Sequence, residues 1–240
     1  MDLGIRGKTA IVCASSKGLG KGCAQALAEA GVNLVLNARG AEALEATATE
    51  IRSAHQVQVA TVAGDITSDE GQAAVLAAAR EMGGTVDILV NNAGGPPPGM
   101  WSDWEKDDWL KALNSNMLTP IALIKAVLPG MIEKKWGRIV NITSQSVKSP
   151  IPVLGLSNAA RAGLTGYVAG TSRQVAQHGV VMNNLLPGAH DTDRIKSLNS
   201  AEVEKRGITM DQAMAERANA IPTKRIGTPA EFGATCAFLC

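Results

Sequence analysis

At 240 residues, the chain is long enough for one sizeable α/β domain with a well-buried core. Its 23 basic and 22 acidic residues leave a net charge of +1, which gives no electrostatic reason to expect nucleic acid or a membrane as a partner. The amino-terminal segment lacks an apolar run and a cleavage site, and we expect no apolar stretch of about 18 residues. The four cysteines show no metal-ligand spacing. These features predict a cytoplasmic protein with reduced thiols and no metal site.

Short apolar runs alternate with longer helical patterns, which is typical of βαβ units. The expected strands are 8–13, 32–37, 58–65, 86–92, 138–143 and 180–186. The expected helices are roughly 18–31, 40–55, 68–82, 105–135, 153–178 and 228–239. Several strands are apolar throughout, as expected when helices cover both faces of a parallel sheet. We predict one Rossmann-like α/β domain over residues 1–240, a doubly wound parallel sheet flanked by helices, with the polar segment 190–225 as a substrate lid.

A glycine-rich turn joins the first strand to the first helix, with the sequence C-A-S-S-K-G-L-G over residues 13–20. Such a turn lets backbone N–H groups approach a pyrophosphate at the helix N-terminus. A plain β–α turn is the alternative interpretation, and the position on the first strand of a βαβ series favours the cofactor. The predicted cofactor-binding residues of this turn are Ser15, Ser16, Lys17, Gly18, Leu19 and Gly20.

The second strand ends in Leu36-Asn37-Ala38-Arg39, without an acidic residue. An acid at this place hydrogen-bonds the ribose hydroxyls of NAD, whereas a cation accommodates the 2′-phosphate of NADP. Lys17 and Arg39 are both expected near that phosphate, although isolated basic residues are often solvated surface cations. The pattern favours NADP over NAD.

The segment GRIVNITSQSVKSPIPVLGLSNAARAGLTGY (137–167) carries the most informative spacing of the chain, because thirteen residues separate Ser144 from Ser157 and four more lead to Arg161. It resembles the active-site segment of the short-chain dehydrogenase/reductase family, in particular 3-oxoacyl-acyl-carrier-protein reductase-like members. There a serine is followed by a Tyr-x-x-x-Lys pair. The resemblance assigns catalytic positions to Asn116, Ser144, Ser157 and Arg161, with serine and arginine in place of tyrosine and lysine.

The resemblance covers roughly residues 5 to 240 and implies further cofactor contacts. Asp65 and Ile66 match the position that contacts adenine, and Arg161 stands where a lysine holds the nicotinamide ribose. The remaining matched residues line the cofactor or hold its carboxamide: Asn92, Ala93, Gly94, Pro187, Gly188 and Thr192. The glycine turn departs from the family pattern Thr-Gly-x-x-x-Gly-x-Gly at Cys13 and Ala14.

With Ser157 and Arg161 at the positions of tyrosine and lysine, the resemblance does not identify the residue that donates the proton. A tyrosine has a reference pKa of roughly 10, whereas a serine hydroxyl is far less acidic and an arginine remains a cation near neutrality. General acid catalysis contributes about 10²–10⁴-fold, and positioning of the reactants on the order of 7–11 kcal/mol. The resemblance therefore implies NADP(H)-dependent hydride transfer to or from a ketone or 3-oxoacyl-like small molecule, with an atypical proton donor. A weak or inactive dinucleotide-binding sensor, or an imine reductase, are the alternatives.

Two other side chains, Tyr167 and His190, are less favoured as the proton donor. Tyr167, the only tyrosine, lies about 240° around the helix from Arg161 and is expected in the core or at an interface. His190 is a lesser candidate for proton transfer. The resemblance also implies a homo-oligomer, tetramer or dimer, through the helices at 105–135 and 153–178. A last strand of the family is expected beyond Cys240 and is missing from the sequence.

Overall fold

The computed structural model describes residues 2–240, except for the side chains of residues 201 and 202. Six strands form one parallel sheet in the order β3-β2-β1-β4-β5-β6. The strands are β1 (Thr9–Val12), β2 (Asn33–Ala38), β3 (Val59–Ala63), β4 (Ile88–Asn91), β5 (Gly137–Ile142) and β6 (Val180–Leu185). All six predicted strands are confirmed, with ends that shift by no more than a few residues. The chain order reverses direction between β1 and β4, as in a doubly wound sheet.

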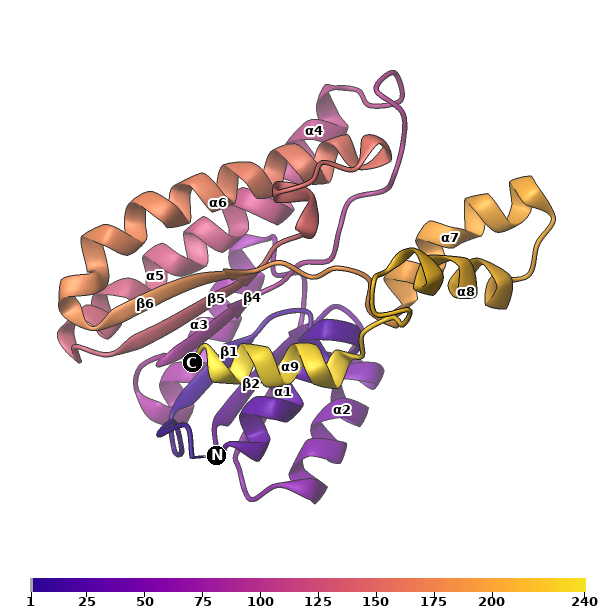
Figure 1. The fold of residues 1–240 in the computed structure, drawn as a ribbon. Coiled ribbons are helices and arrows are strands. Elements are labelled where there is room, and N and C mark those ends of the chain that lie inside the picture. Colours follow the sequence, from indigo (N-terminus) through magenta and orange to yellow (C-terminus); the bar gives the residue numbers. More distant parts are fainter. Residues whose placement is uncertain (1) are drawn as a thin grey trace.

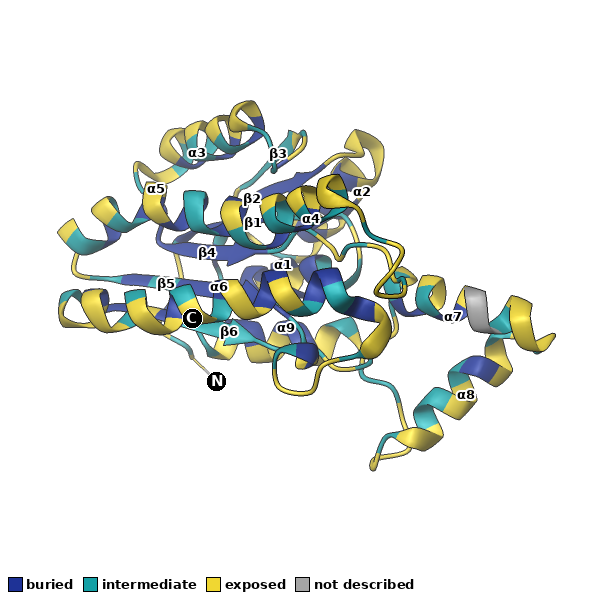
Figure 2. Ribbon diagram, turned by 90° about the horizontal axis from the view of Figure 1, so that it is seen from above, coloured by how far each residue is buried: buried dark blue, intermediate teal, exposed yellow. Residues whose placement is uncertain are grey.

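Helices cover both faces of the sheet (Figure 1). On one face lie α1 (Gly18–Glu29), α2 (Ala41–Ala54) and α9 (Pro229–Phe238); on the other lie α3 (Asp69–Gly83), α5 (Thr119–Glu133) and α6 (Gly155–Val175). The strands are buried between these layers, whereas the outer helix faces are exposed (Figure 2). The sandwich confirms the predicted fold class and makes the loops at the strand ends the accessible positions for a ligand.

Two core clusters, one on each face, fix the sheet between its helices. Leu27, Leu34 and Leu36 are fully buried in the first cluster, and Ile11, Leu89 and Ile124 are fully buried in the second. Because alternate residues of a strand point to opposite faces, the continuous apolar strands supply side chains to both clusters. The four cysteines are buried free thiols, and burial raises the pKa of Cys13 to about 12.

The helix predicted over 105–135 is interrupted in the structure. It consists of α4 (Lys106–Leu113), a π-helical turn η1 (Asn114–Leu118) and α5. Pro120 in the first turn of α5 has no N–H, so it cannot donate the α-helical hydrogen bond to the carbonyl of Asn116. A π-turn accommodates such a break, and it lies at a predicted catalytic residue.

The same stretch corrects a second expectation. Lys106–Glu133 is long and apolar enough, by length and composition alone, to cross a membrane, so the expectation of no such stretch is wrong. Leu123, Ile124 and Val127 of α5 are nevertheless buried in the second core cluster. A helix that buries one face in the core of a protein meets the same criterion.

The segment predicted as a lid contains two helices, α7 (Asp193–Arg206) and α8 (Met210–Ala220), that project away from the sheet (Figure 1). The periodicity of α7 is weak because few of its described side chains are buried; Ile195 and Asn199 are the main ones. Arg217 of α8 donates to Asn199 Oδ1 at 2.5 and 3.0 Å and joins the two helices. The first turn of α7 returns to the sheet, where it reaches the candidate site.

Candidate functional site

The carboxyl ends of β1, β4, β5 and β6 meet at one edge of the sheet, and the predicted site residues lie in the loops that follow them. A doubly wound sheet binds ligands at this edge, near the point where the strand order reverses. Thr192 lies next to the glycine-rich turn here, because a Cβ placed on Gly18 would stand 3.4 Å from the Thr192 methyl carbon. Two motifs 174 residues apart in sequence therefore share one site.

The glycine-rich turn has the backbone of an anion cradle. Ala14 and Gly18 adopt positive φ values of 48° and 57°, and a Cβ on Gly20 would collide with the carbonyl oxygen of Ala14. No side chain caps the N-terminus of α1, and its first turn has no acidic residue. The free N–H groups at this helix end suit a negatively charged group.

The serines and Leu19 of the turn have different surroundings. The Ser15 Oγ is buried and exchanges hydrogen bonds with the backbone of Asn37, at 3.1 and 3.3 Å, so it ties the turn to β2 instead of facing a ligand. Ser16 is half-buried, and its carbonyl accepts from Thr47 Oγ1. Leu19 packs against the first core cluster. Of the two predicted serines, Ser15 is buried and bonded to β2, and Ser16 is the more accessible one.

The two basic residues predicted at the cofactor phosphate have different partners. Lys17 Nζ lies 2.6 Å from Asp193 Oδ2 in an exposed ion pair, which joins the glycine-rich turn to the start of α7. Arg39 is exposed at the end of β2, and its charge contributes to a lowered pKa of Asp65. Arg39 is thus available to a ligand, whereas Lys17 must exchange its carboxylate partner for one.

Asp65 and Ile66 follow β3 in a tight turn. Asp65 Oδ1 accepts hydrogen bonds from the N–H and the Oγ1 of Thr67, both at 2.9 Å, and these bonds lower the pKa of the carboxyl group. Asp65 is exposed, and its second carboxylate oxygen accepts no hydrogen bond from a described residue, while Ile66 is buried. The arrangement leaves one acceptor oxygen for a ligand.

The loop after β4 carries Asn92, Ala93 and Gly94. Asn92 Nδ2 would lie 3.1 Å from a Cβ on Gly20, so this loop touches the glycine-rich turn. Gly94 has a φ of 73°, a left-handed conformation that favours glycine. Its carbonyl oxygen turns inward and accepts a hydrogen bond from Arg161.

Arg161 is the central side chain of the site. Its Nε donates to Ser157 Oγ at 3.2 Å, and its Nη1 donates to the carbonyls of Ile142 and Thr143 at 2.6 and 2.8 Å. Its Nη2 donates to Gly94 O at 2.8 Å. The guanidinium is buried, and among the described residues no carboxylate pairs with it. Burial and, to a smaller extent, the charge of Arg194 lower the pKa of Arg161 to about 10, so it stays a cation near neutrality.

These contacts restrict what Arg161 can do. A guanidinium has five N–H donors, and four of them bond to the protein. Only one N–H on Nη2 remains for a ribose hydroxyl, so the predicted role in holding the nicotinamide ribose rests on a single donor. The side chain instead fastens α6 to the ends of β4 and β5.

Ser144 and Ser157 lie on the two elements that Arg161 joins. Ser144 is half-buried at the end of β5, and its Oγ accepts from the N–H of Ser146 at 3.1 Å in the turn η2 (Gln145–Val147). The next residue before it, Thr143, is the one whose carbonyl binds Arg161. Ser157 is buried in the first turn of α6. The predicted serines and arginine are therefore brought together.

Asn116 is buried in the π-turn, where its Nδ2 donates to Ser115 Oγ at 2.9 Å. A cavity lies between it and Arg161, with room for about one water molecule (≈ 10 Å³ for the water's centre). Asn91 also lines this cavity, and its buried Oδ1 has no protein partner. The cavity therefore brings Asn116, Arg161 and an unpartnered buried acceptor to one place that is large enough for a single water molecule.

The segment after β6 supplies Pro187, Gly188 and Thr192. The Pro187 carbonyl accepts from the N–H of Gln145, which brings this segment next to Ser144. A Cβ on Gly188 would stand 3.2 Å from Gln145 Oε1, and Thr192 immediately precedes α7 beside Gly18. The three predicted residues thus frame the space between the glycine-rich turn and the serines.

The other candidates for proton transfer lie in different surroundings. The His190 ring packs edge-on against Phe232 of α9, with centroids 5.2 Å apart. Tyr167 is half-buried against the second core cluster, as predicted. The nearby tryptophans have no part in proton transfer: Trp104 and Trp109 pack against each other, whereas Trp101 is 86% exposed. Neither His190 nor Tyr167 hydrogen-bonds any of the four predicted catalytic residues in the described structure.

Arg194 is a residue of the site that sequence reasoning missed. It lies in the first turn of α7, is half-buried, and donates from Nη2 to Pro96 O at 2.7 Å. Nothing in its sequence surroundings distinguishes it from the other cations of the segment 190–225. Only the fold reveals that it returns to the loop after β4.

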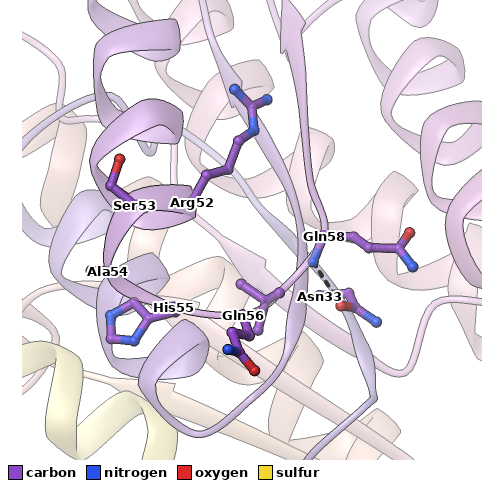
Figure 3. A pocket seen from close by; sticks show the side chains of 8 residues that line it. Asn33, Arg52, Ser53, Ala54, His55, Gln56 and Gln58 are labelled. Atoms are coloured by element: carbon purple, nitrogen blue, oxygen red, sulfur yellow. Dashed lines mark hydrogen bonds between the residues drawn. The ribbon is translucent and has the colours of Figure 1, made fainter.

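A depression of ≈ 620 Å³ lies at the amino ends of β2 and β3, away from the predicted motifs; Figure 3 shows the side chains that line it. The end of α2 and the starts of β2 and β3 form it, and Gln58 N donates to Asn33 Oδ1 across it at 3.0 Å. It is wide open and collects no group of unpaired charged side chains; Arg52 at its rim bonds Val59 O and Glu45. We place the functional site at the carboxyl edge because the predicted motifs converge there.

The family described as short chain dehydrogenase matches residues 8–203 of the chain. The chain belongs to the short-chain dehydrogenase family. It is 34% identical over 239 residues to the 3-oxoacyl-acyl-carrier-protein reductase FabG of Vibrio cholerae, which covers 99% of this chain and 91% of the relative. It is 29% identical over 233 residues to the NADPH-dependent reductase BacG of Bacillus subtilis, over 97% of this chain and 90% of the relative.

The fold agrees with solved members of the family. L-sorbose reductase from Gluconobacter frateurii, complexed with NADPH and L-sorbose, superposes with a TM-score of 0.94 at 27% identity. The match covers 100% of this chain and 92% of that one. The sequence-based assignment to this family is confirmed.

Proposed function

We propose that the protein is an NADP(H)-dependent oxidoreductase that transfers a hydride between nicotinamide and the carbonyl carbon of a ketone or 3-oxoacyl-like small molecule. Family membership and the named activities of the relatives support the reaction class. The observation that carries the proposal is the position of Arg161, which joins Ser157 to the ends of β4 and β5 beside Ser144.

The chain offers a suitable place for NADP. The uncapped N-terminus of α1 would bind the diphosphate, and Lys17 and Arg39 would bind the 2′-phosphate. Asp65 would contact the adenine, and Thr192 the carboxamide. The remaining predicted contacts come from the loops after β4 and β6. When bound, the cofactor supplies or accepts the hydride, and the NADPH named for two relatives supports this choice over NAD.

Ser144 and Ser157 would act on the substrate oxygen. The Oγ of Ser157 accepts the Nε–H of Arg161, so its own proton is free for another acceptor. As the carbonyl oxygen gains negative charge, the adjacent guanidinium would stabilise it, since electrostatic interactions strengthen in a buried site. The Ser157 hydroxyl would donate its proton to this oxygen and would regain one from solvent; the single-water cavity is lined by Asn116 and Arg161 and by neither of these two serines.

One observation favours a weaker enzyme or a dinucleotide sensor. Four of the five donors of Arg161 bind the protein, which leaves little for the nicotinamide ribose. Imine reduction is the other alternative, because a substrate that arrives protonated requires no donor from the chain.

The test measures NADPH oxidation with ketones, 3-oxoacyl thioesters and cyclic imines, in wild type and in Ser144→Ala. We expect turnover that falls by about 10²-fold or more in the variant. Tight NADPH binding without turnover on any substrate would support the sensor, and turnover on imines alone would support imine reduction. The double variant Ser157→Tyr with Arg161→Lys is the comparison: a large gain on ketones would mark the native site as a weakened version of the family's.

We further propose that residues 190–225 form a lid over the substrate and that the protein is a homo-oligomer, a tetramer or dimer. The ion pair of Lys17 with Asp193 supports the lid, because it links the segment to the cofactor turn. The exposed Leu110 and Leu118 of α4 and η1 support the oligomer, since exposed apolar side chains on these helices suit a subunit interface.

A further inference from the structure

Arg194 is a cation whose charge is not balanced within the protein. One of its five N–H groups donates to Pro96 O, and no described carboxylate forms an ion pair with it. The two acidic residues that flank it in sequence are engaged elsewhere, Asp193 with Lys17 at 2.6 Å and Asp191 with Lys196 at 3.6 Å. Four donors of Arg194 therefore remain for a ligand.

Arg194 and Arg161 hold the same short loop. Arg161 Nη2 donates to the carbonyl of Gly94, and Arg194 Nη2 donates to the carbonyl of Pro96, two residues later. A Cβ on Gly95, between them, would stand 3.1 Å from Arg194 Nη2. The loop between two guanidinium groups has no acidic side chain from Asn91 to Trp101.

Two neighbouring cations that are withdrawn from water destabilise each other. Burial lowers the pKa of both, and the charge of Arg194 adds to the lowering at Arg161. A bound anion would offset both effects, and a guanidinium offers a fork that matches the two oxygens of a carboxylate. The two guanidinium groups beside this loop therefore favour a ligand that carries a negative charge.

We propose that Arg194 determines substrate specificity by binding a carboxylate of the substrate, so that the protein acts on oxo acids or hydroxy acids in preference to neutral ketones. This inference rests on the proposed function for its reaction and on the two arginines for its substrate class. The cofactor diphosphate is the other source of anionic oxygens. We favour the substrate because the hydrogen bond of Arg194 goes to the loop that Arg161 also bonds, while it is Asp193, the preceding residue, that pairs with Lys17 of the diphosphate cradle.

The test first measures binding, which does not depend on turnover. Malonate and its neutral diamide are titrated by calorimetry into the NADPH-loaded protein, in wild type, Arg194→Gln and Arg194→Lys. Lys205→Gln is the matched control, because it removes one exposed positive charge from the same helix. We expect wild type and the control to bind malonate at least tenfold more tightly than the diamide, Arg194→Gln to lose that preference, and Arg194→Lys to keep part of it.

The second arm compares turnover of acetoacetate and methyl acetoacetate together with the Kd for NADPH. We expect Arg194→Gln to lower kcat/KM for acetoacetate at least tenfold and kcat/KM for the methyl ester less than threefold. The Kd for NADPH should change less than threefold. If the wild type does not bind malonate, or if Arg194→Gln binds it as tightly as the wild type, the inference is overturned. A weakened NADPH affinity with unchanged malonate binding would assign Arg194 to the diphosphate. A malonate preference that depends on Arg194, without turnover of either the ester or the acid, would count against the proposed reaction while keeping Arg194 as a carboxylate-binding residue.

Discussion

The Nε–H of Arg161 donates a hydrogen bond to the Oγ of Ser157, one turn earlier in α6, at 3.2 Å. The Nη groups of the same side chain are held by carbonyls of β5 and of the loop after β4. The bond therefore fixes the Ser157 hydroxyl relative to the sheet. Ser157 and Arg161 therefore form a connected unit that fastens α6 to the backbone of the candidate site.

Replacing Arg161 should destabilise the protein. Arg161→Ala removes hydrogen bonds to the buried carbonyls of Ile142 and Thr143 and a third to the carbonyl of Gly94, so we expect the free energy of unfolding to fall by about 2–4 kcal/mol in urea titrations. Arg161→Lys should recover part of the loss, because an ammonium has three donors and no fork. Ser157→Ala, which removes a single acceptor, is the control and should cost less than about 1.5 kcal/mol. An Arg161→Ala variant as stable as the wild type would contradict this role.

The strands could be predicted from the sequence because each is a continuous apolar run. A strand of a sheet that is covered on both faces needs apolar residues at successive positions, and this pattern is visible locally in the sequence. The position of Arg161 could be predicted from the spacing of the family motif, but its partners could not. They are backbone carbonyls, and every residue has one. The same holds for Pro96 and Arg194, which are 98 residues apart.

The interruption of the long helix was missed although its cause is visible in the sequence. Pro120 cannot donate to the carbonyl of Asn116, but a proline in the first turn of a helix is also a normal start signal. The pattern alone does not distinguish a new helix from a π-turn. The ion pair of Lys17 with Asp193 is equally invisible, because it joins two exposed side chains 176 residues apart.

Ala14→Gly should stabilise the glycine-rich turn. Ala14 has a φ of 48°, where a Cβ is unfavourable and where the family pattern has glycine. We expect a gain of up to about 1 kcal/mol in the free energy of unfolding, reduced by the extra freedom of glycine in the unfolded chain. Ala162→Gly, at an exposed position in the middle of α6, is the control and should lose about 1 kcal/mol. Equal losses in both variants would show that Ala14 is not strained.

Asp193→Asn should tighten binding of NADPH. The substitution frees Lys17 for the 2′-phosphate, and the ion pair that it breaks is exposed and worth about 0.2–1 kcal/mol. We therefore expect the Kd for NADPH to fall by up to about fivefold and the Kd for NADH to stay constant, measured by cofactor fluorescence at low salt. Asp191→Asn, which frees Lys196 instead, gives the same change in net charge and serves as the control. An equal effect of both variants would mean that net charge, and not Lys17, sets the affinity.

Glu231 should make the stability of the protein depend on pH on the acid side. Two hydrogen bonds from Arg225 and bonds from the Thr228 N–H and Oγ1 lower the pKa of its carboxyl group from 4.5 to about 2. A carboxyl group whose pKa is lower in the folded protein than in the unfolded chain stabilises the folded state at any pH above the unfolded-state pKa. This stabilisation is lost as the pH falls to the folded-state pKa. We expect Glu231→Gln to melt below the wild type at pH 7, and the difference to shrink between pH 4.5 and 2. The midpoints are measured by circular dichroism, with Glu216→Gln of α8 as the control for an exposed arginine pair. A difference that stays constant over this range would show that the carboxylate charge does not hold the start of α9.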